Sequence, residues 1–230
     1  MLSTKTIPQS PVGPALLAAT VPNAPQTTLE IAGVISIPAL RMPFARNEEL
    51  FGAEEPADFV YQVISGVVRT LRLLDDGRRQ IISFHFAGEL FGLEGGAVHT
   101  VSAEAVSDCE IVLARRSLVE RAAGESPIVA HALWLLAVGS LRQAQQHMTL
   151  LGRCSARERV EAFLSEMATR GHHSEAVDLA MSRTDIADYL GLTIETVSRT
   201  LSQMERRRVI ALPRSRRVVL RDRGAFADAA

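Results

Sequence analysis

The stretch MSRTDIADYLGLTIETVSRTL, residues 181–201, predicts two short helices that meet at a tight turn. Its apolar positions are spaced as the inner faces of two amphipathic helices that pack together. These positions are Ile186 and Leu190 in the first half and Val197 and Leu201 in the second. Gly191 lies between the halves and suits the positive φ that such a turn needs. We therefore expect a helix-turn-helix.

The polar residues of the second helix suggest what the motif binds. Thr193 is a good helix cap, and Glu195, Ser198 and Arg199 follow at positions i, i+3 and i+4 of one exposed face. An acceptor, a hydroxyl and a guanidinium at the start of a second helix suit the reading of base edges in the major groove. The alternative is a solvated Glu–Arg ion pair with no further role. We predict that these three residues read DNA bases.

The segment after the motif strengthens this prediction. Residues 206–208 are three arginines, and VIALP (209–213) and RRVVL (216–220) predict two short strands joined across Pro213-Arg214-Ser215. A hairpin directly after a recognition helix is a wing, which lies beside the phosphate backbone. The predicted backbone contacts are Ser182, Thr184, Thr193, Thr196, Arg214, Arg216 and Arg217.

Charge is distributed unevenly along the chain. The 230 residues carry a net charge of −1, yet residues 182–223 hold ten arginines against five acidic residues, a net charge of +5. The remainder then carries about −6. This asymmetry indicates a polyanionic partner for the C-terminal end alone, and double-stranded DNA is that partner in our interpretation.

Composition limits the other classes of protein. The longest apolar run, residues 128–141, is too short to span a membrane, and no basic-then-apolar signal pattern opens the chain. Two cysteines make neither a disulfide framework nor a four-cysteine cluster. We expect a cytoplasmic protein with no membrane partner and no cofactor.

An enzyme of the cupin type is the first functional alternative. His85, Glu89 and His99 lie in the β-rich part of the chain, but the pair of histidines one residue apart with which such metal sites normally start is missing. No nucleophile–base pair or phosphate-binding glycine loop has a recognisable context either. The chain is therefore not expected to be an enzyme or to hold a metal.

The predicted organisation is α+β, with four segments. Residues 1–29 hold five of the ten prolines and are expected to form a flexible tail. Residues 30–125 contain short β-rich runs separated by turn signals such as Asp75-Asp76-Gly77, typical of an antiparallel β-roll. Residues 126–153 predict one long helix, and residues 154–230 the winged helix-turn-helix domain. That last segment opens with another amphipathic helix, for which Ser155 and Glu158 form a capping box.

The long helix is expected to form a dimer contact. Its length of about 40 Å exceeds the diameter of a small domain. Its apolar stripe suits a two-stranded contact with the same helix of a second copy. Packing against its own barrel alone is the alternative. The predicted contact residues are Ile128, Leu135, Val138, Leu141, Gln145 and Met148.

A β-roll, a long helix and a winged helix, in that order, resemble the CRP/FNR family of bacterial transcription regulators over roughly residues 30–225. The sharpest matches are GVVR (66–69), GELFG (88–92), RERVEAFL (157–164) and GLTIETVSRTL (191–201). The last resembles the FNR and FixK branch, in which Glu-x-x-Ser-Arg reads half-sites of the TTGAT type. The resemblance implies a homodimer, mainly an activator, that binds an inverted repeat of TTGA-type half-sites and contacts RNA polymerase.

Two departures from the family concern regulation. An FNR-type iron–sulfur cluster needs about four thiolates, held largely by N-terminal cysteines, but no cysteine precedes Cys109. The Arg-Ser pair that meets cyclic AMP in CRP falls here on His99 and Thr100, so no arginine meets the phosphate. We expect no small-molecule effector. An effector-gated regulator stays the alternative, as does haem binding by His85 or His99.

The two cysteines are candidates for redox regulation. Cys109 lies in a predicted strand, where an inert buried thiol is the default. Cys154 lies near the predicted hinge beside Arg153 and Arg157, which would favour its thiolate. An oxidation switch at Cys154 is the hypothesis, and an inert thiol is the alternative.

Overall fold

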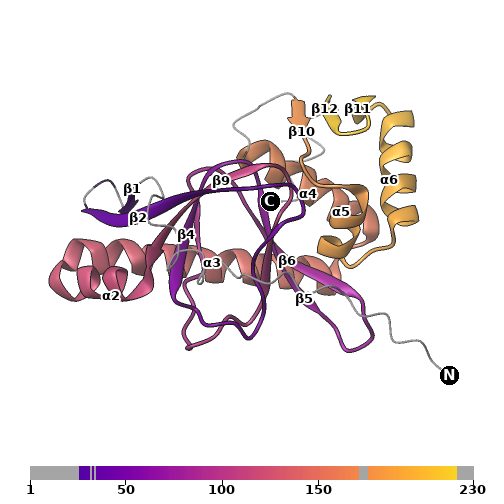
Figure 1. Cartoon of the computed structure of the whole chain (residues 1–230). Helices are drawn as coiled ribbons and strands as arrows, with labels where there is room; N and C mark the ends of the chain where they lie inside the picture. The colour runs from indigo at the N-terminus through magenta and orange to yellow at the C-terminus, as the bar shows by residue number, and fades with distance from the viewer. Residues whose placement is uncertain (1–25, 32, 34, 171–175, 222–230) are drawn as a thin grey trace.

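The computed structural model describes residues 26–31, 33, 35–170 and 176–221. Figure 1 shows a β-roll, a long helix α3 and a C-terminal domain of short helices and strands. The predicted α+β class and the order of the parts are confirmed. In the described part of the chain, no helix is long and apolar enough to cross a membrane.

Two antiparallel sheets form the roll. One has the strand order β1-β2-β9-β4-β7 and the other β3-β8-β5-β6. The strands are β1 (Gln26–Ile31), β2 (Ile35–Phe44), β3 (Glu49–Phe51), β4 (Phe59–Ser65), β5 (Val68–Leu73), β6 (Arg79–His85), β7 (Leu90–Phe91), β8 (Ser102–Ala105) and β9 (Cys109–Arg115). Phe51, Tyr61, Phe91 and Ile111 belong to the apolar core between them.

Turn residues fix the register of the roll. Asp75-Asp76-Gly77 turns β5 into β6 as predicted, with Gly77 at a φ of 81°. Gly66 connects β4 to β5 at a φ of 87°. A Cβ atom there would lie 2.4 Å from the carbonyl oxygen of Asp108, so only glycine fits this turn.

Two elements near the roll correct the predicted boundaries. Strand β1 begins at Gln26, so the last residues of the predicted 1–29 tail pair with β2 instead. Its alternating Leu29 and Ile31 are buried, which explains the strand; residues 1–25 lie outside the described part. Helix α2 (Arg116–Glu125) closes the predicted 30–125 segment, where only strands were expected. Its buried Val119 packs on the outer face of the roll.

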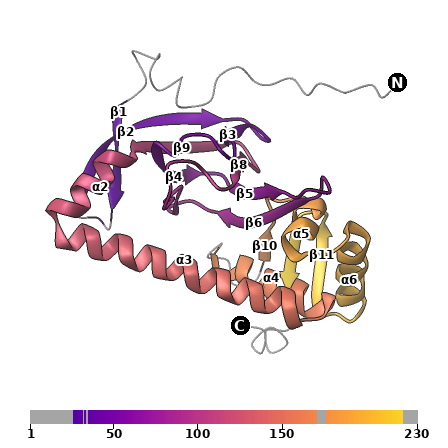
Figure 2. The same ribbon diagram turned by 90° about the horizontal axis from the view of Figure 1, so that it is seen from below.

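Helix α3 (Pro127–Arg153) is the predicted long helix. Pro127 stands at its first position, where no amide hydrogen is needed, and the Ser126 hydroxyl caps it. Figure 2 shows α3 running beneath the roll from α2 to the C-terminal domain. Its first turns join the apolar core of the roll through the fully buried Val129.

The C-terminal domain begins with α4, which the predicted capping box opens. The Ser155 amide donates to Glu158 at 2.6 Å, and the Glu158 amide donates to the Ser155 hydroxyl at 3.4 Å. The elements are α4 (Ala156–Arg170), β10 (Ala176–Asp178), α5 (Arg183–Leu190), α6 (Ile194–Arg206), β11 (Ile210–Arg214) and β12 (Arg217–Leu220). Strand β10 was not predicted and pairs with β12.

The wing hairpin is present, but its turn lies later than predicted. Strand β11 runs through Pro213 to Arg214, so the turn is Ser215-Arg216 rather than Pro213-Arg214-Ser215. The register shifts between Ala211 and Arg214. Proline has no amide hydrogen for the ladder, and this irregularity accommodates it inside the strand.

The C-terminal domain packs directly on the roll. Leu71, Ile81 and Phe84 of the roll share one apolar core with residues of α4, α5 and α6. The Phe84 ring lies 5.2 Å from that of Tyr189 in α5. Burial of apolar surface between the two parts therefore holds them together.

Candidate nucleic-acid interface

Local capping bonds shape the helix-turn-helix. The Ser182 hydroxyl accepts from the Asp185 amide at 3.1 Å, and the Ser182 amide donates to the Asp185 carboxylate at 2.9 Å, which opens α5. Gly191 ends that helix in the left-handed region, at a φ of 61°. The Thr193 hydroxyl accepts from the Thr196 amide at 3.2 Å and opens α6. The predicted turn at Gly191 and the predicted Thr193 cap are thus confirmed, whereas the Ser182 cap was not predicted.

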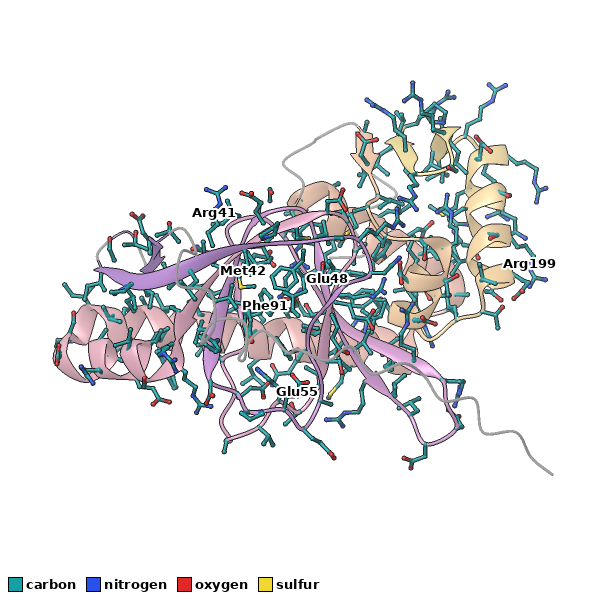
Figure 3. The ribbon with its side chains drawn as sticks, viewed as in Figure 1. Arg41, Met42, Glu48, Glu55, Phe91 and Arg199 are labelled. Atoms are coloured by element: carbon teal, nitrogen blue, oxygen red, sulfur yellow. The ribbon has the colours of Figure 1, made fainter. Side chains whose placement is uncertain are left out.

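Helix α6 separates apolar and polar side chains onto two faces. Val197, Leu201 and Met204 are buried against α4 and α5. Glu195, Ser198 and Arg199 are all exposed. In Figure 3 the labelled Arg199 extends from the outer side of α6. The three predicted base-reading residues therefore share one accessible face.

Glu195 is set up as an ionised acceptor. Its own backbone amide, the Thr193 hydroxyl and the positive charge of Arg199 together lower the pKa of its carboxyl group. A carboxylate accepts hydrogen bonds and donates none. At neutral pH this side chain can accept from an exocyclic amine of cytosine or adenine but not donate to a carbonyl group.

The wing presents its arginines to solvent. Arg214, Arg216 and Arg217 are exposed, and Arg217 makes a 3.6 Å ion pair with Asp178 of β10. The wing is tied to the start of α5 because Arg183 donates to the Ser215 carbonyl oxygen at 2.9 Å. This bond holds the wing turn beside the first turn of the helix-turn-helix.

The four predicted hydroxyl contacts differ in what else they do. The Ser182 hydroxyl also donates to the Asp185 carboxylate at 2.8 Å, so it already donates one hydrogen bond and accepts another within the protein. The Thr193 and Thr196 hydroxyls lie 3.1 Å apart in the α6 cap. Thr184 is exposed in the first turn of α5 and is the freest of the four to meet a phosphate.

Three exposed residues of α6 were not among the predicted contact residues. Ile194 opens the helix with 41% of its surface exposed. Ser202 and Arg206 continue the outer face of Ser198 and Arg199 by one and two turns. Extending the same helical period beyond Arg199 would have found the last two.

Helix α3 presents a long apolar face to solvent. Ile128, Leu135, Leu141 and Met148 are between 56% and 71% exposed, and Gln145 is exposed too. Val138 is half-buried. Trp134, 65% exposed, lies on the same helix and was not predicted. A contiguous exposed face of this size is typical of a contact with another protein surface.

Aromatic rings fill the interior of the roll at the position compared with the cyclic AMP site. His99 is 1% exposed and stacks on Phe51 with ring centroids 3.6 Å apart. Tyr61 and Phe91 stack on each other beside them, at 5.2 Å, and Figure 3 labels Phe91 inside the roll. The Thr100 hydroxyl donates to Glu94 at 3.3 Å. The side chains of His99 and Thr100 thus contact aromatic rings and a carboxylate.

One of the two arginines expected beside the Cys154 thiol forms an ion pair with another residue. Cys154 caps the end of α3 and is half-buried, and its carbonyl oxygen accepts from Arg159 at 3.0 Å. Arg157, expected beside the thiol, instead pairs with Glu161 at 2.7 Å. Cys109 is buried and donates to the Val67 carbonyl oxygen at 3.2 Å. The oxidation switch at Cys154 stays a prediction.

Comparison with known proteins agrees with this architecture. Residues 158–229 match the model of the Crp-like helix-turn-helix domain, and residues 41–125 match that of the cyclic nucleotide-binding domain. The nitrogen fixation regulation protein FixK of Azorhizobium caulinodans is 50% identical over 202 residues, covering 86% of this chain and 80% of that protein. The chain belongs to the CRP/FNR family of transcription regulators.

Other members of the family are similar over most of their length. The FixK protein of Rhizobium meliloti is 41% identical, covering 80% of this chain and 84% of that protein. The solved structure of FixK2 from Bradyrhizobium japonicum is 47% identical and superimposes with a TM-score of 0.80, covering 83% of this regulator and 96% of that chain. The regulator thus carries its helix-turn-helix on the FixK type of fold.

Proposed function

We propose that this regulator activates transcription as a homodimer that reads an inverted repeat of TTGA-type half-sites without a small-molecule effector. The observation that carries the proposal is the accessible face of α6, with Glu195, Ser198 and Arg199 side by side. Arg199 can fork onto O6 and N7 of a guanine, Glu195 can accept from cytosine or adenine, and Ser198 can sit against a thymine.

The exposed face of α3 supports the homodimer. A single recognition helix reads about five base pairs, which is too few for a genome, so two half-sites related by a two-fold axis are needed. Leu141 and Met148 lie in the C-terminal half of α3, and Figure 2 shows that this end of the helix reaches the DNA-binding domain. A symmetric contact there would hold the two recognition helices at a fixed spacing.

The filled roll supports activity without an effector. The cyclic phosphate of a nucleotide needs a cation, and His99 and Thr100 stand where CRP has its Arg-Ser pair. Burial is the main reason that the pKa of His99 is lowered, and it outweighs the opposing effect of Glu94. The ring is therefore neutral at physiological pH. A neutral imidazole packed between aromatic rings offers the phosphate no charge.

We propose further that the regulator acts by binding rather than catalysis, and that RNA polymerase is its partner at the promoter. The names of the relatives support an activator: one relative, from Pseudomonas aeruginosa, is called transcriptional activator protein anr. An activator must contact the transcription machinery, and exposed surfaces of both domains would make this contact.

Fluorescence anisotropy tests the proposal directly. The reduced full-length protein is titrated against a labelled TTGA-N6-TCAA duplex and a scrambled duplex at about 150 mM salt, a concentration at which specificity is meaningful. We expect selective binding with a Kd on the order of 10⁻⁸ M or tighter and no requirement for added ligand. Equal affinity for the two duplexes would overturn the assignment of the half-site.

Cyclic AMP separates the proposal from the effector-gated alternative. A ligand that binds the native state raises the melting temperature. We expect the melting curve and the duplex affinity to be the same with and without a millimolar concentration of cyclic AMP. A rise in both would identify an effector-gated regulator of the same family.

A further inference from the structure

A buried ion pair joins the roll to the helix-turn-helix. Arg69 on β5 is 5% exposed, and Asp185 in the first turn of α5 is 3% exposed. The Arg69 Nη1 atom donates to the Asp185 carboxylate at 3.0 Å, and its Nε atom donates to Glu104 of β8 at 2.9 Å. A charged pair that is nearly closed to solvent thus crosses between the two domains.

A second arginine reaches α5 from the neighbouring strand. The Arg79 Nη2 atom on β6 donates to Asp185 at 2.7 Å, and its Nε atom donates to Asp188 at 2.9 Å. The β5–β6 hairpin therefore holds the first helix of the motif at two carboxylates, one turn apart. Figure 2 shows this hairpin reaching α5.

This network favours one orientation of the DNA-binding domain. The apolar contact of Phe84 with Tyr189 is non-directional and would tolerate rotation of the domain. Arginine–carboxylate pairs are directional because the guanidinium is a rigid planar fork. A rotated domain that kept its apolar contact would break the Arg69–Asp185 ion pair and leave both groups buried with only their remaining partners, Glu104 and Ser182, which is unfavourable.

The same contacts leave the DNA-reading surface free. They involve only the inner side of α5, whereas Glu195, Ser198 and Arg199 of α6 are exposed. The network therefore does not occlude the recognition helix. We infer that Arg69 and Arg79 are positioning residues for DNA binding, which act through Asp185 and Asp188 to hold the helix-turn-helix in its DNA-binding orientation without a ligand. This inference rests on the proposed function.

A double-mutant cycle on the rim of the network tests the inference. Arg79 and Asp188 are 24% and 23% exposed at their side chains, so replacing them leaves the buried Arg69–Asp185 pair in place and the chain folded. The variants are Arg79→Gln, Asp188→Asn and the double variant. The matched control is Arg72→Gln, an exposed arginine of β5 that donates to the Thr100 carbonyl oxygen within the roll.

Each variant is titrated against the TTGA-N6-TCAA and scrambled duplexes. We expect each single substitution to weaken specific binding about tenfold, with Arg79→Gln the weaker binder because Arg79 also donates to Asp185. The double variant should be no weaker than Arg79→Gln, since the Arg79–Asp188 interaction is already lost in that variant. Scrambled-duplex affinity should change little, because loose phosphate contacts do not need two recognition helices in register. Arg72→Gln should bind both duplexes as the wild type does.

Three results would overturn the inference. Unchanged specific affinity with a lower melting temperature would make the network a stabilising contact only. Additive losses would mean that the two residues act separately. Tighter binding would show that the network holds an inhibited arrangement. The wild type is measured before any variant. If it does not bind the TTGA duplex more tightly than the scrambled duplex, the proposed function itself is wrong.

Discussion

The ring of His99 stacks on that of Phe51 with centroids 3.6 Å apart. His99 Nδ1 lies 3.4 Å from a Glu94 carboxylate oxygen, while His99 Nε2 is buried with no hydrogen-bond partner among the described residues. An imidazole in this setting resists protonation, because the cation would lose its water. The stack that fills the roll is thereby also sensitive to acid.

This environment predicts a pH dependence of stability. The pKa of His99 in the folded protein lies below the ordinary 6.5. Below pH 6.5 the unfolded chain then binds more protons than the folded one, so the free energy of unfolding falls as the pH falls. One such group contributes a slope of up to about 1.4 kcal/mol per pH unit. Urea unfolding measured from pH 5 to 8 tests this.

The variant His99→Gln isolates the contribution of this ring. It removes the titrating group, so its stability should fall less steeply below pH 6.5 than that of the wild type. Parallel curves for His99→Gln and the wild type would show that another group causes the acid sensitivity.

Arg199→Ala should remove sequence discrimination. A bidentate arginine–guanine contact is worth about 1–3 kcal/mol against the wrong base, so specific affinity should fall roughly tenfold to a hundredfold at each half-site. Sedimentation should show an unchanged oligomeric state, because Arg199 is exposed on α6, away from α3. A variant that still prefers the TTGA duplex by the wild-type ratio would exclude Arg199 as a base reader.

Arg216→Ala should weaken binding to every sequence alike. Arg216 is exposed in the wing turn, where it would meet a phosphate and no base edge. Losing one phosphate contact reduces the slope of log K against log salt by about 1. Arg121→Ala removes the same charge from α2, at the far end of the molecule, and should leave the slope unchanged. A sequence-dependent loss for Arg216→Ala would instead indicate base contact.

Local signals explain why the helix-turn-helix was predictable. The positive φ of Gly191 and the Thr193 cap, both predicted, depend on residues within three positions of the structure they form. The Ser182–Asp185 capping box is equally local, although it was not predicted. The spacing of the apolar residues in α5 and α6 then identifies the face of each helix that is buried. Each signal acts over a few residues, so the sequence alone identifies both the motif and the exposed face of α6.

Contacts between distant segments were not predictable in the same way. Arg69 and Asp185 are 116 residues apart, and no local sequence pattern around either residue indicates that the other is its partner. Asp185 was recognisable only as a polar residue near a helix start. The shifted wing turn has a similar cause, because the irregularity that accommodates Pro213 depends on how β11 pairs with β12. Tertiary pairing decides both features.

Leu141→Glu should dissociate the proposed dimer. Leu141 is 58% exposed in the single chain, so a carboxylate there costs the isolated protomer little. In a two-fold contact the substitution occurs twice, and each buried leucine contributes about 1.5–3 kcal/mol. The dimer dissociation constant should therefore rise by at least a hundredfold. Leu73→Glu alters a leucine of similar exposure, 69%, at the end of β5 and should leave the dimer intact. Sedimentation velocity over a concentration series distinguishes the two, and a dimer that survives Leu141→Glu but not Leu73→Glu would move the interface from α3 to the β5–β6 hairpin.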